Sequence, residues 1–478
     1  MNGLFIPDYI EIDGGRPLTR DASVNISGAK NEVLGAMAAA VLSDQPIEFA
    51  NMPYISDVLD MGRIMLDLGI DVQYDPAARL MRIHAARVTS NQLPELAGKF
   101  RASYYLWGAL LSRFQNTGEF NSLKIKLPGG CSFSGNRKTD YHFALIENIF
   151  GANVAQNDGG IEFSLPRGVP KQDTDPVFAT DVMSHGATVH WLLSVAAGAR
   201  FKVLYNASLE PEVPHLLGIL NKMGANLRGT GTTAISNMGH GGLLSGGSFE
   251  IMPDRMEASS YILLAMLLRD RITINGMDSK ACRPCLNSIS EIVRQSNMKS
   301  DPQSFYNTGC GSPACFDFSQ LRDFPGQKFV MSPFPGKETD LHQVWAPVLA
   351  TASSASEIYD PVWTGRKAHL PEMAKFGIES ASSLFNSENE RSVATKTLHI
   401  IVRPSEIKPA TDAAGMDLRG TFGLIAAAAK ARGSSRIYTP EYALRGYPNL
   451  MRNLSNIGIS IRQSERGVFL PPLPQLQH

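Results

Sequence analysis

Five segments of the chain are rich in small and branched apolar residues, with few charges among them. A helix that is apolar on most of its sides has to be buried, so these segments predict core helices. They are residues 33–42, 187–197, 260–268, 345–353 and 423–431. Short runs with β-branched and aromatic residues follow several of them and predict strands. These runs are residues 46–49, 201–204 and 271–274.

A second pattern marks the ends of amphipathic helices: an apolar residue, then a glycine, then the start of a strand. Glycine is favoured there because the residue that closes a helix often adopts the left-handed conformation. The pattern occurs five times, and a sixth copy has Asn297 at the glycine position; the glycines are Gly69, Gly151, Gly224, Gly377 and Gly458. Six repeated helix and strand units predict two α/β domains of three units each. The alternative is an ordinary α/β protein with coincidental helix caps.

Composition limits the function classes. A chain of 478 residues is long enough for two or three domains. Lys plus Arg equals Asp plus Glu at 45 each, so the charge balance gives no reason to expect nucleic acid or a membrane as a partner. The N-terminus lacks the pattern of a signal peptide, and no apolar run approaches the length of about 18 residues that a membrane span needs. Five cysteines in so long a chain indicate a reducing, cytoplasmic location.

The segment 127–137 (LPGGCSFSGNR) has the composition of a loop, because proline, paired glycine and serine favour turns. It places Cys131 at its tip and Arg137 six residues later. A thiol on such a loop can swing onto a bound ligand, and a nearby guanidinium favours the thiolate. The alternative is a free cysteine in an ordinary surface loop.

Nine short motifs lie far apart along the chain. They are 27–31 (SGAKN), 101–105 (RASYY), 128–131 (PGGC), 206–212 (NASLEPE), 253–257 (PDRME), 338–341 (ETDL), Arg366 with 369–372 (HLPE), 417–419 (DLR) and 444–447 (LRGY). In this order and approximate spacing, they resemble the UDP-N-acetylglucosamine enolpyruvyl transferase family, and the resemblance extends from about residue 10 to residue 461.

The resemblance implies an α/β fold with two inside-out, barrel-like domains, each built from three βαβαββ repeats. Residues 30–252 would form the first domain, which carries the cysteine loop, and residues 1–29 with 253–478 the second, discontinuous one. The implied reaction joins phosphoenolpyruvate to a hydroxyl of a uridine nucleotide and releases phosphate. The family needs no metal and no organic cofactor.

The implied chemistry assigns roles to particular residues. Protonation of C3 makes C2 of phosphoenolpyruvate electrophilic, so an acid is needed there and a base is needed at the acceptor hydroxyl. By resemblance, Cys131 would be that acid or would aid product release, Asp340 would be the base, and Asp417 would relay protons. Lys30, a catalytic candidate, would bind phosphoenolpyruvate together with Arg137 and Arg445.

The other residues implied by the resemblance contact substrates. Three arginines would line the same site and suit carboxylate and phosphate because the guanidinium is a planar, forked donor. They are Arg101, Arg366 and Arg419. Asn31 would hold the acceptor, and the remaining expected binding residues are Asp140, Ser184, Gly186 and Val362.

The sequence departs from the family where the acceptor nucleotide is recognised. Lys138 replaces a proline, the interval from Cys131 to Arg137 is one residue longer, and His185 replaces an apolar residue in the segment 183–188 (MSHGAT). His185 could meet a phosphate or be a neutral core group. Such changes fit a family offshoot that modifies the 3′-hydroxyl of uridine monophosphate in nucleoside-antibiotic pathways. They also fit ordinary drift, and a non-catalytic nucleotide-binding relative is a third reading.

Two further segments stand out. The insertion 282–326 contains four cysteines whose paired spacing could ligate zinc. The simpler interpretation is four unrelated thiols: Cys282, Cys285, Cys310 and Cys315. The segment 387–416 predicts an excursion on the protein surface.

Overall fold

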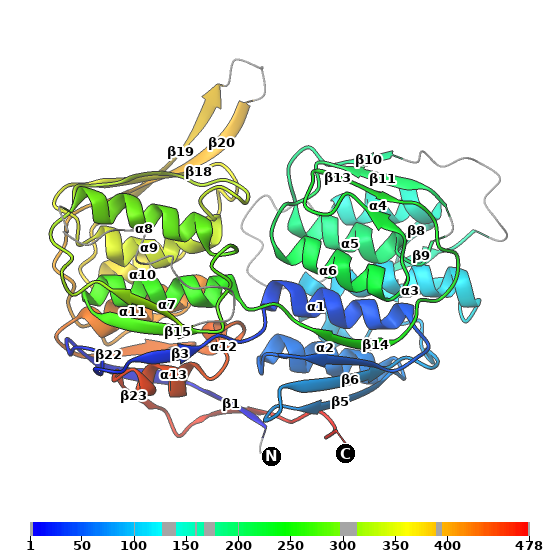
Figure 1. Cartoon of the computed structure of the whole chain (residues 1–478), viewed down its shortest axis with the longest axis horizontal. Coiled ribbons are helices and arrows are strands. Elements are labelled where there is room, and N and C mark those ends of the chain that lie inside the picture. Colours follow the sequence, from blue (N-terminus) through cyan, green and yellow to red (C-terminus); the bar gives the residue numbers. More distant parts are fainter. Residues whose placement is uncertain are drawn as a thin grey trace. The chain divides into compact units, whose positions relative to one another are not determined.

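The computed structural model describes residues 3–99, 101–126, 140–157, 160–166, 177–198, 200–296, 313–388 and 394–476. The chain divides into two compact units, each with its own set of sheets and helices (Figure 1). Unit 1 comprises the N-terminal segment to Ser27 and the segment from Pro253 to Pro471. Unit 2 runs from Gly28 to Met252 and also includes the residues from Pro472 onward.

The described part of unit 2 contains three sheets. Two of them share one arrangement, in which a parallel pair of strands is extended by an antiparallel hairpin. The first has the order β14 (Gly247–Glu250), β4 (Ile47–Ala50), β6 (Leu80–His84) and β5 (Asp71–Asp75). The second has the order β10 (Val177–Ala179), β11 (Lys202–Tyr205), β13 (Ala234–Asn237) and β12 (Leu227–Arg228). The third is antiparallel: β7 (Ser122–Ile125), β9 (Gly160–Ser164) and β8 (Asn153–Asn157).

The helices of unit 2 pack against one another and against these sheets. The two expected core segments form α1 (Lys30–Ala39) and α5 (His185–Val195), and their apolar residues are almost wholly buried. Burial of both helices follows from the run of mostly apolar, mostly small residues after the first turn of each. The other helices are α2 (Ser56–Asp67), α3 (Tyr104–Thr117), α4 (Asp140–Phe150) and α6 (Glu212–Lys222).

In unit 1, one sheet repeats the arrangement of parallel pair and hairpin, and another extends a parallel pair by two antiparallel strands that come from opposite ends of the chain. One has the order β17 (Lys328–Val330), β18 (Ser356–Asp360), β20 (Ala394–Val402) and β19 (Ser380–Glu388). The other has the order β21 (Ala413–Ala414), β22 (Gly433–Tyr438), β2 (Tyr9–Gly14) and β23 (Ser460–Gln463). A third sheet joins β16 (Ala314–Asp317), β15 (Arg271–Asn275) and β3 (Ser23–Asn25), and β1 (Leu4–Pro7) pairs with β24 (Gly467–Leu470).

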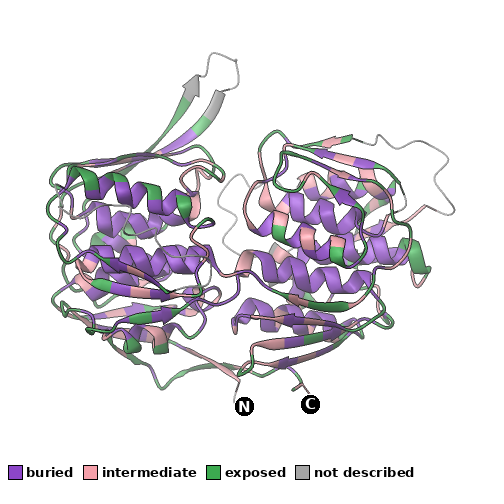
Figure 2. Cartoon of the chain, viewed as in Figure 1, coloured by how far each residue is buried: buried purple, intermediate pink, exposed green. Residues whose placement is uncertain are grey.

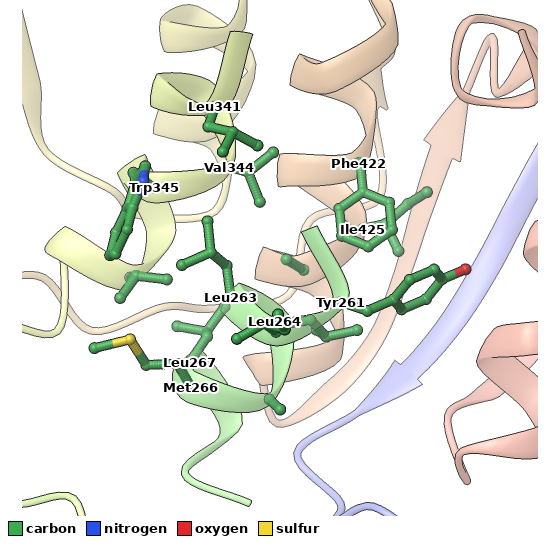
Figure 3. Packing of buried hydrophobic residues seen from close by; sticks show 14 of the residues in the cluster. Tyr261, Leu263, Leu264, Met266, Leu267, Leu341, Val344, Trp345, Phe422 and Ile425 are labelled. Atoms are coloured by element: carbon green, nitrogen blue, oxygen red, sulfur yellow. The ribbon is translucent and has the colours of Figure 1, made fainter. Parts of the chain in front are cut away.

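Three helices form the centre of unit 1: α7 (Arg255–Leu268), α9 (His342–Leu349) and α11 (Leu418–Lys430). Figure 3 shows Leu263 and Leu264 of α7 beside Val344 of α9 and Phe422 of α11, all of them buried. The same helices are almost wholly buried in Figure 2, which confirms the three core segments expected here. The remaining helices are α8 (Arg283–Gln295), α10 (His369–Lys375), α12 (Glu441–Leu444) and α13 (Leu450–Asn456).

The glycine caps are confirmed at five positions. Each follows the end of a helix (α2, α4, α6, α10 or α13), and a strand starts within three residues. All five glycines have positive φ angles between 62° and 106°, the left-handed region in which a side chain would be strained. They are Gly69, Gly151, Gly224, Gly377 and Gly458. The sixth expected cap, Asn297, lies outside the described residues.

The prediction of a surface excursion over residues 387–416 holds for residues 403–409, which are exposed or half-buried outside any helix or strand, and is wrong for the strand before them. Strand β20 lies in this segment and pairs on both sides, with β18 and with β19. Leu398, Ile400 and Val402 are fully buried, because side chains of alternate residues point to the same face of a strand.

The cysteine insertion is described in part. Cys282 and Cys285 are buried at the start of α8, where burial raises the pKa of both thiols. Cys315 lies on β16, and Cys310 is outside the described residues. The described side chains contain no group of three or more His, Cys, Asp or Glu placed to hold a metal ion. No helix among the described residues is long and apolar enough to cross a membrane.

Candidate active site

The expected site residues of unit 2 begin at the start of α1. Gly28 precedes the helix, and a Cβ atom at this position would lie 2.0 Å from the carbonyl oxygen of Asn51. Glycine therefore lets the chain pass close to that backbone. Lys30 is the first residue of α1, and its Nζ lies 2.7 Å from Oδ2 of Asp57 on α2. The ion pair is largely buried and holds the ammonium group in a defined position.

The next two residues of α1 are also held. The carbonyl oxygen of Asn31 lies 3.1 Å from Nε2 of His185. Glu32 is buried, and its Oε2 accepts a hydrogen bond of 2.8 Å from the backbone N–H of Met252. Its Oε1 contacts Nδ1 of His215 on α6. The first turn of α1 is therefore fixed by groups from several elements.

The start of α5 carries the second expected group of unit 2. Ser184 is the N-cap, and its hydroxyl accepts a hydrogen bond of 3.3 Å from the backbone N–H of Ala187. Gly186 lies in the first turn, where a Cβ atom would be 3.8 Å from the ring of His142. His185, between them, is turned toward α1 and Glu210.

In unit 1, the expected base lies in a short turn ahead of α9. Asp340 Oδ1 is 2.5 Å from Nη1 of Arg366, and 35% of the Asp340 side chain is exposed. The exposure matters because a general base has to reach its substrate. Glu338 in the same segment pairs with Arg255 Nη1 at 2.8 Å, and both side chains are buried.

Asp360, at the end of β18, joins the two sides of this site. Its Oδ2 accepts a hydrogen bond from the hydroxyl of Thr339, which in turn accepts one of 3.2 Å from Arg366 Nη1. Its Oδ1 accepts two hydrogen bonds of 2.9 Å, from the backbone N–H groups of Val362 and Trp363. Burial alone would raise the pKa of Asp360, but His342 and these donors lower it. A charged carboxylate therefore fixes the turns that carry Asp340 and Arg366.

Arg419 is the most unusual expected residue. It is 4% exposed, its guanidinium carbon lies 4.9 Å from the centre of the Tyr447 ring, and Nη2 lies 4.0 Å from Asp254 Oδ1. Its Nε and Nη1 have no hydrogen-bond partner among the described residues. Burial lowers the pKa of Arg419, but Tyr447, Asp254 and Asp340 raise it, so the group stays charged. Buried cationic donors without partners are suited to an anionic ligand.

Asp417 is the N-cap of α11. Its Oδ1 accepts hydrogen bonds from the backbone N–H groups of Arg419 and Gly420, at 3.1 and 2.8 Å. Its Oδ2 accepts one of 2.6 Å from Gln343 Nε2. Both oxygens are thus engaged in holding the helix start from which Arg419 projects.

The remaining expected residues are placed less completely. Arg445 is partly buried just after α12, and Val362 is 43% exposed. Arg101 opens a 3₁₀ turn ahead of α3, and Asp140 is the first residue of α4. Cys131 and Arg137 lie outside the described residues.

The structure therefore brings together Asp340, Arg366 and Arg419 in unit 1, and Lys30, Asn31 and the start of α5 in unit 2. Sequence reasoning missed the connecting role of Asp360. An aspartate at a strand end followed by Pro361 is a recognisable turn signal, but nothing local shows that it also binds Thr339.

Comparison with known proteins shows the family to which the chain belongs. The family model for EPSP synthase (3-phosphoshikimate 1-carboxyvinyltransferase) matches residues 13–454. UDP-N-acetylglucosamine 1-carboxyvinyltransferase 2 of Clostridium acetobutylicum is 30% identical over 460 residues, covering 96% of this chain and all of the relative. The UDP-N-acetylglucosamine 1-carboxyvinyltransferase of Thermus thermophilus is 30% identical over 462 residues, covering 96% of this chain and 98% of the relative.

Solved structures show the same fold. The enolpyruvyl transferase NikO from Streptomyces tendae superposes with a TM-score of 0.77 at 22% identity, covering 95% of this chain and 98% of that one. EPSP synthase from Acinetobacter baumannii gives a TM-score of 0.61 at 14% identity, covering 96% of this chain and all of that one. The expected enolpyruvyl transferase fold is thereby confirmed. The chain belongs to the EPSP synthase (3-phosphoshikimate 1-carboxyvinyltransferase) family and is an enolpyruvyl transferase.

Proposed function

We propose that the protein transfers the enolpyruvyl group of phosphoenolpyruvate to the 3′-hydroxyl of UDP-N-acetylglucosamine and releases phosphate. One observation carries the proposal: Asp340 is held by Arg366 near the buried Arg419, whose Nε and Nη1 have no partner among the described residues. A proton acceptor beside an anion-binding group is what the addition of a hydroxyl to phosphoenolpyruvate requires.

In the proposed first step, the oxygen of the acceptor hydroxyl forms a bond with C2 of phosphoenolpyruvate, and Asp340 takes the proton of that hydroxyl. C3 gains a proton at the same stage, and we assign its delivery to Cys131. In the second step, C3 gives a proton to the Cys131 thiolate as the bond between C2 and the phosphate oxygen breaks, which forms the enol ether. The proton held by Asp340 passes to the departing phosphate, so both residues return to their starting states. The tetrahedral intermediate carries a phosphate and a carboxylate, which we assign to Arg419, Lys30 and other cations.

The other expected residues receive supporting roles. We assign Arg101, Arg137, Arg366 and Arg445 to the anionic groups of the donor and the intermediate. Because both oxygens of Asp417 are engaged, we assign it to positioning Arg419, and proton relay remains a prediction.

A further set of expected residues is assigned to the acceptor. We propose that Asn31, Asp140, Ser184, Gly186 and Val362 contact it. The names of the relatives that are 30% identical support UDP-N-acetylglucosamine as this acceptor. Peptidoglycan synthesis is the process that we infer for it from the family resemblance. Uridine monophosphate, with nucleoside-antibiotic synthesis as the process, is the second candidate. His185 is what favours it: by the resemblance stated above, this residue is a departure in the segment expected to contact the nucleotide.

The test is release of phosphate from phosphoenolpyruvate with each acceptor supplied in turn. UDP-N-acetylglucosamine should support turnover, and uridine monophosphate should support little. A reversal of the two rates would establish the second candidate. Binding of either nucleotide without phosphate release would instead support a non-catalytic, nucleotide-binding protein.

A further inference from the structure

Three consecutive residues at the start of α1 are each held by a different partner. Lys30 pairs with Asp57, the carbonyl of Asn31 with His185, and Glu32 with His215 and the backbone of Met252. Side chains from α2, α5 and α6 therefore converge on one helical turn. The partner of Asn31 stands out, because the contact of its carbonyl oxygen with His185 joins α1 to the start of α5.

His185 makes two contacts, one from each ring nitrogen. Nε2 lies 3.1 Å from the carbonyl oxygen of Asn31, and Nδ1 lies 3.3 Å from Oε2 of Glu210. The second contact lacks hydrogen-bond alignment and is best described as an ion pair. The His185 side chain is 16% exposed. Since both nitrogens face oxygens of the protein, the ring bridges two segments instead of presenting a nitrogen to a phosphate.

The surrounding charges decide the protonation state of this bridge. Burial lowers the pKa of His185, but the carboxylates of Glu210 and Glu212 and the Asn31 carbonyl raise it to about 9. The ring is therefore an imidazolium at neutral pH, with an N–H on each nitrogen. A neutral ring would keep one N–H and could donate to only one of the two oxygens.

We propose that His185 is a positioning residue for the acceptor: it links Glu210 to the Asn31 carbonyl and so fixes the turn from which Asn31 holds the acceptor nucleotide. This inference rests on the acceptor role proposed for Asn31. An apolar side chain at position 185 can make neither polar contact. In this chain, the recognition segment at the start of α5 is thus joined to α1 by a charged bridge.

The bridge makes acceptor binding dependent on pH. Three groups face His185 from two segments: Glu210 just before α6 and Glu212 at its start, and the Asn31 carbonyl on α1. Glu32, which follows Asn31 in the chain, likewise raises the pKa of a histidine, His215. Because the folded-state pKa of His185 is above its ordinary value of 6.5, its stabilising effect is full below 6.5 and is lost as pH rises to about 9.

The experiment compares wild-type enzyme with His185→Val, which removes both contacts, and His185→Gln, which keeps a neutral donor. His84→Val is the matched control, because His84 in the same unit also contacts one backbone carbonyl, that of Asp44 at 3.1 Å. Phosphate release is measured at varied acceptor and varied phosphoenolpyruvate, from neutral pH to above the pKa of His185.

For His185→Val, the KM for the acceptor should rise roughly tenfold or more, with a much smaller change in the KM for phosphoenolpyruvate. His185→Gln should recover part of the loss, and His84→Val should match wild type. The wild-type acceptor KM should rise as pH passes about 9, and that rise should be missing in His185→Val. A KM for the acceptor that is unchanged by the substitution, or an equal change for both substrates, would overturn the positioning role.

Failure of the proposed reaction gives a different result. If wild type binds UDP-N-acetylglucosamine or uridine monophosphate but releases no phosphate, the Kd of that nucleotide is measured in place of the KM. This Kd should then rise in His185→Val, recover in part in His185→Gln, and rise with pH in wild type only. If wild type binds neither nucleotide, the positioning role for an acceptor is overturned as well.

Discussion

Replacing Arg419 by methionine should separate stability from activity. In the folded protein, two N–H groups of Arg419 are buried without a described partner, at a cost of about 1–3 kcal/mol each. Against this, the contact with the Tyr447 ring contributes about 0.5–2 kcal/mol. Asp254 keeps its hydrogen bonds from the N–H groups of Met256 and Glu257 when the arginine is gone. The difference between these ranges leaves the free energy of unfolding unchanged or raises it by up to about 5 kcal/mol.

Binding of the donor, phosphoenolpyruvate, should become weaker in Arg419→Met, although the folded protein is no less stable. If both unpartnered N–H groups bind phosphoenolpyruvate, Arg419→Met loses two charge-assisted hydrogen bonds of about 1.5–3 kcal/mol each. Binding of phosphoenolpyruvate should then weaken by at least about 100-fold. Denaturant unfolding measures the first quantity, and the KM for phosphoenolpyruvate in a phosphate-release assay measures the second.

Arg436→Met is the matched control for Arg419→Met. Arg436 also lies against a tyrosine ring, 4.4 Å from the centre of Tyr9, and pairs with Glu11 at 2.6 Å, but its side chain is 38% exposed. Its loss should leave the kinetics unchanged and have a small effect on stability, as for exposed ion pairs. Arg419 does not bind the donor if Arg419→Met lowers the free energy of unfolding by more than about 2 kcal/mol while the KM for phosphoenolpyruvate stays at the wild-type value.

Three further changes test other parts of the proposed site. Asp340→Asn should keep substrate binding and lose most turnover, because the amide cannot accept the hydroxyl proton; near-normal kcat would exclude Asp340 as the base. Lys30→Met should raise the KM for phosphoenolpyruvate and destabilise the fold by removing the ion pair with the largely buried Asp57, and unchanged donor kinetics would remove Lys30 from the donor site. Brief treatment with iodoacetamide or a small epoxide should label Cys131 before Cys282 and Cys285, whose burial raises their thiol pKa values; peptide mapping that finds the reverse order would contradict a reactive loop thiol.

The sequence predicted the features of the fold that depend on local patterns. Runs of small apolar residues identified the buried helices, and glycines with positive φ identified five helix ends. Strand β20 was missed because its first residues are polar, although Leu398, Ile400 and Val402 alternate as a buried strand requires.

The internal connections of the site could not be predicted in the same way. Glu210 lies 25 residues after His185 in the sequence, and Asn31 lies 154 residues before it, so only the folded chain shows that the imidazole bridges them. The link from Asp360 to Thr339 is equally nonlocal. Likewise, the two unpartnered N–H groups of Arg419 are a property of the packed interior and leave no pattern in the sequence.

The most direct test of the account is the mass of the acceptor after incubation with enzyme and phosphoenolpyruvate. If an intact enolpyruvyl group is transferred, UDP-N-acetylglucosamine should gain the mass of phosphoenolpyruvate less that of phosphoric acid, with one phosphate released for each product formed. Release of phosphate while UDP-N-acetylglucosamine and uridine monophosphate both keep their masses would contradict transfer to a uridine nucleotide.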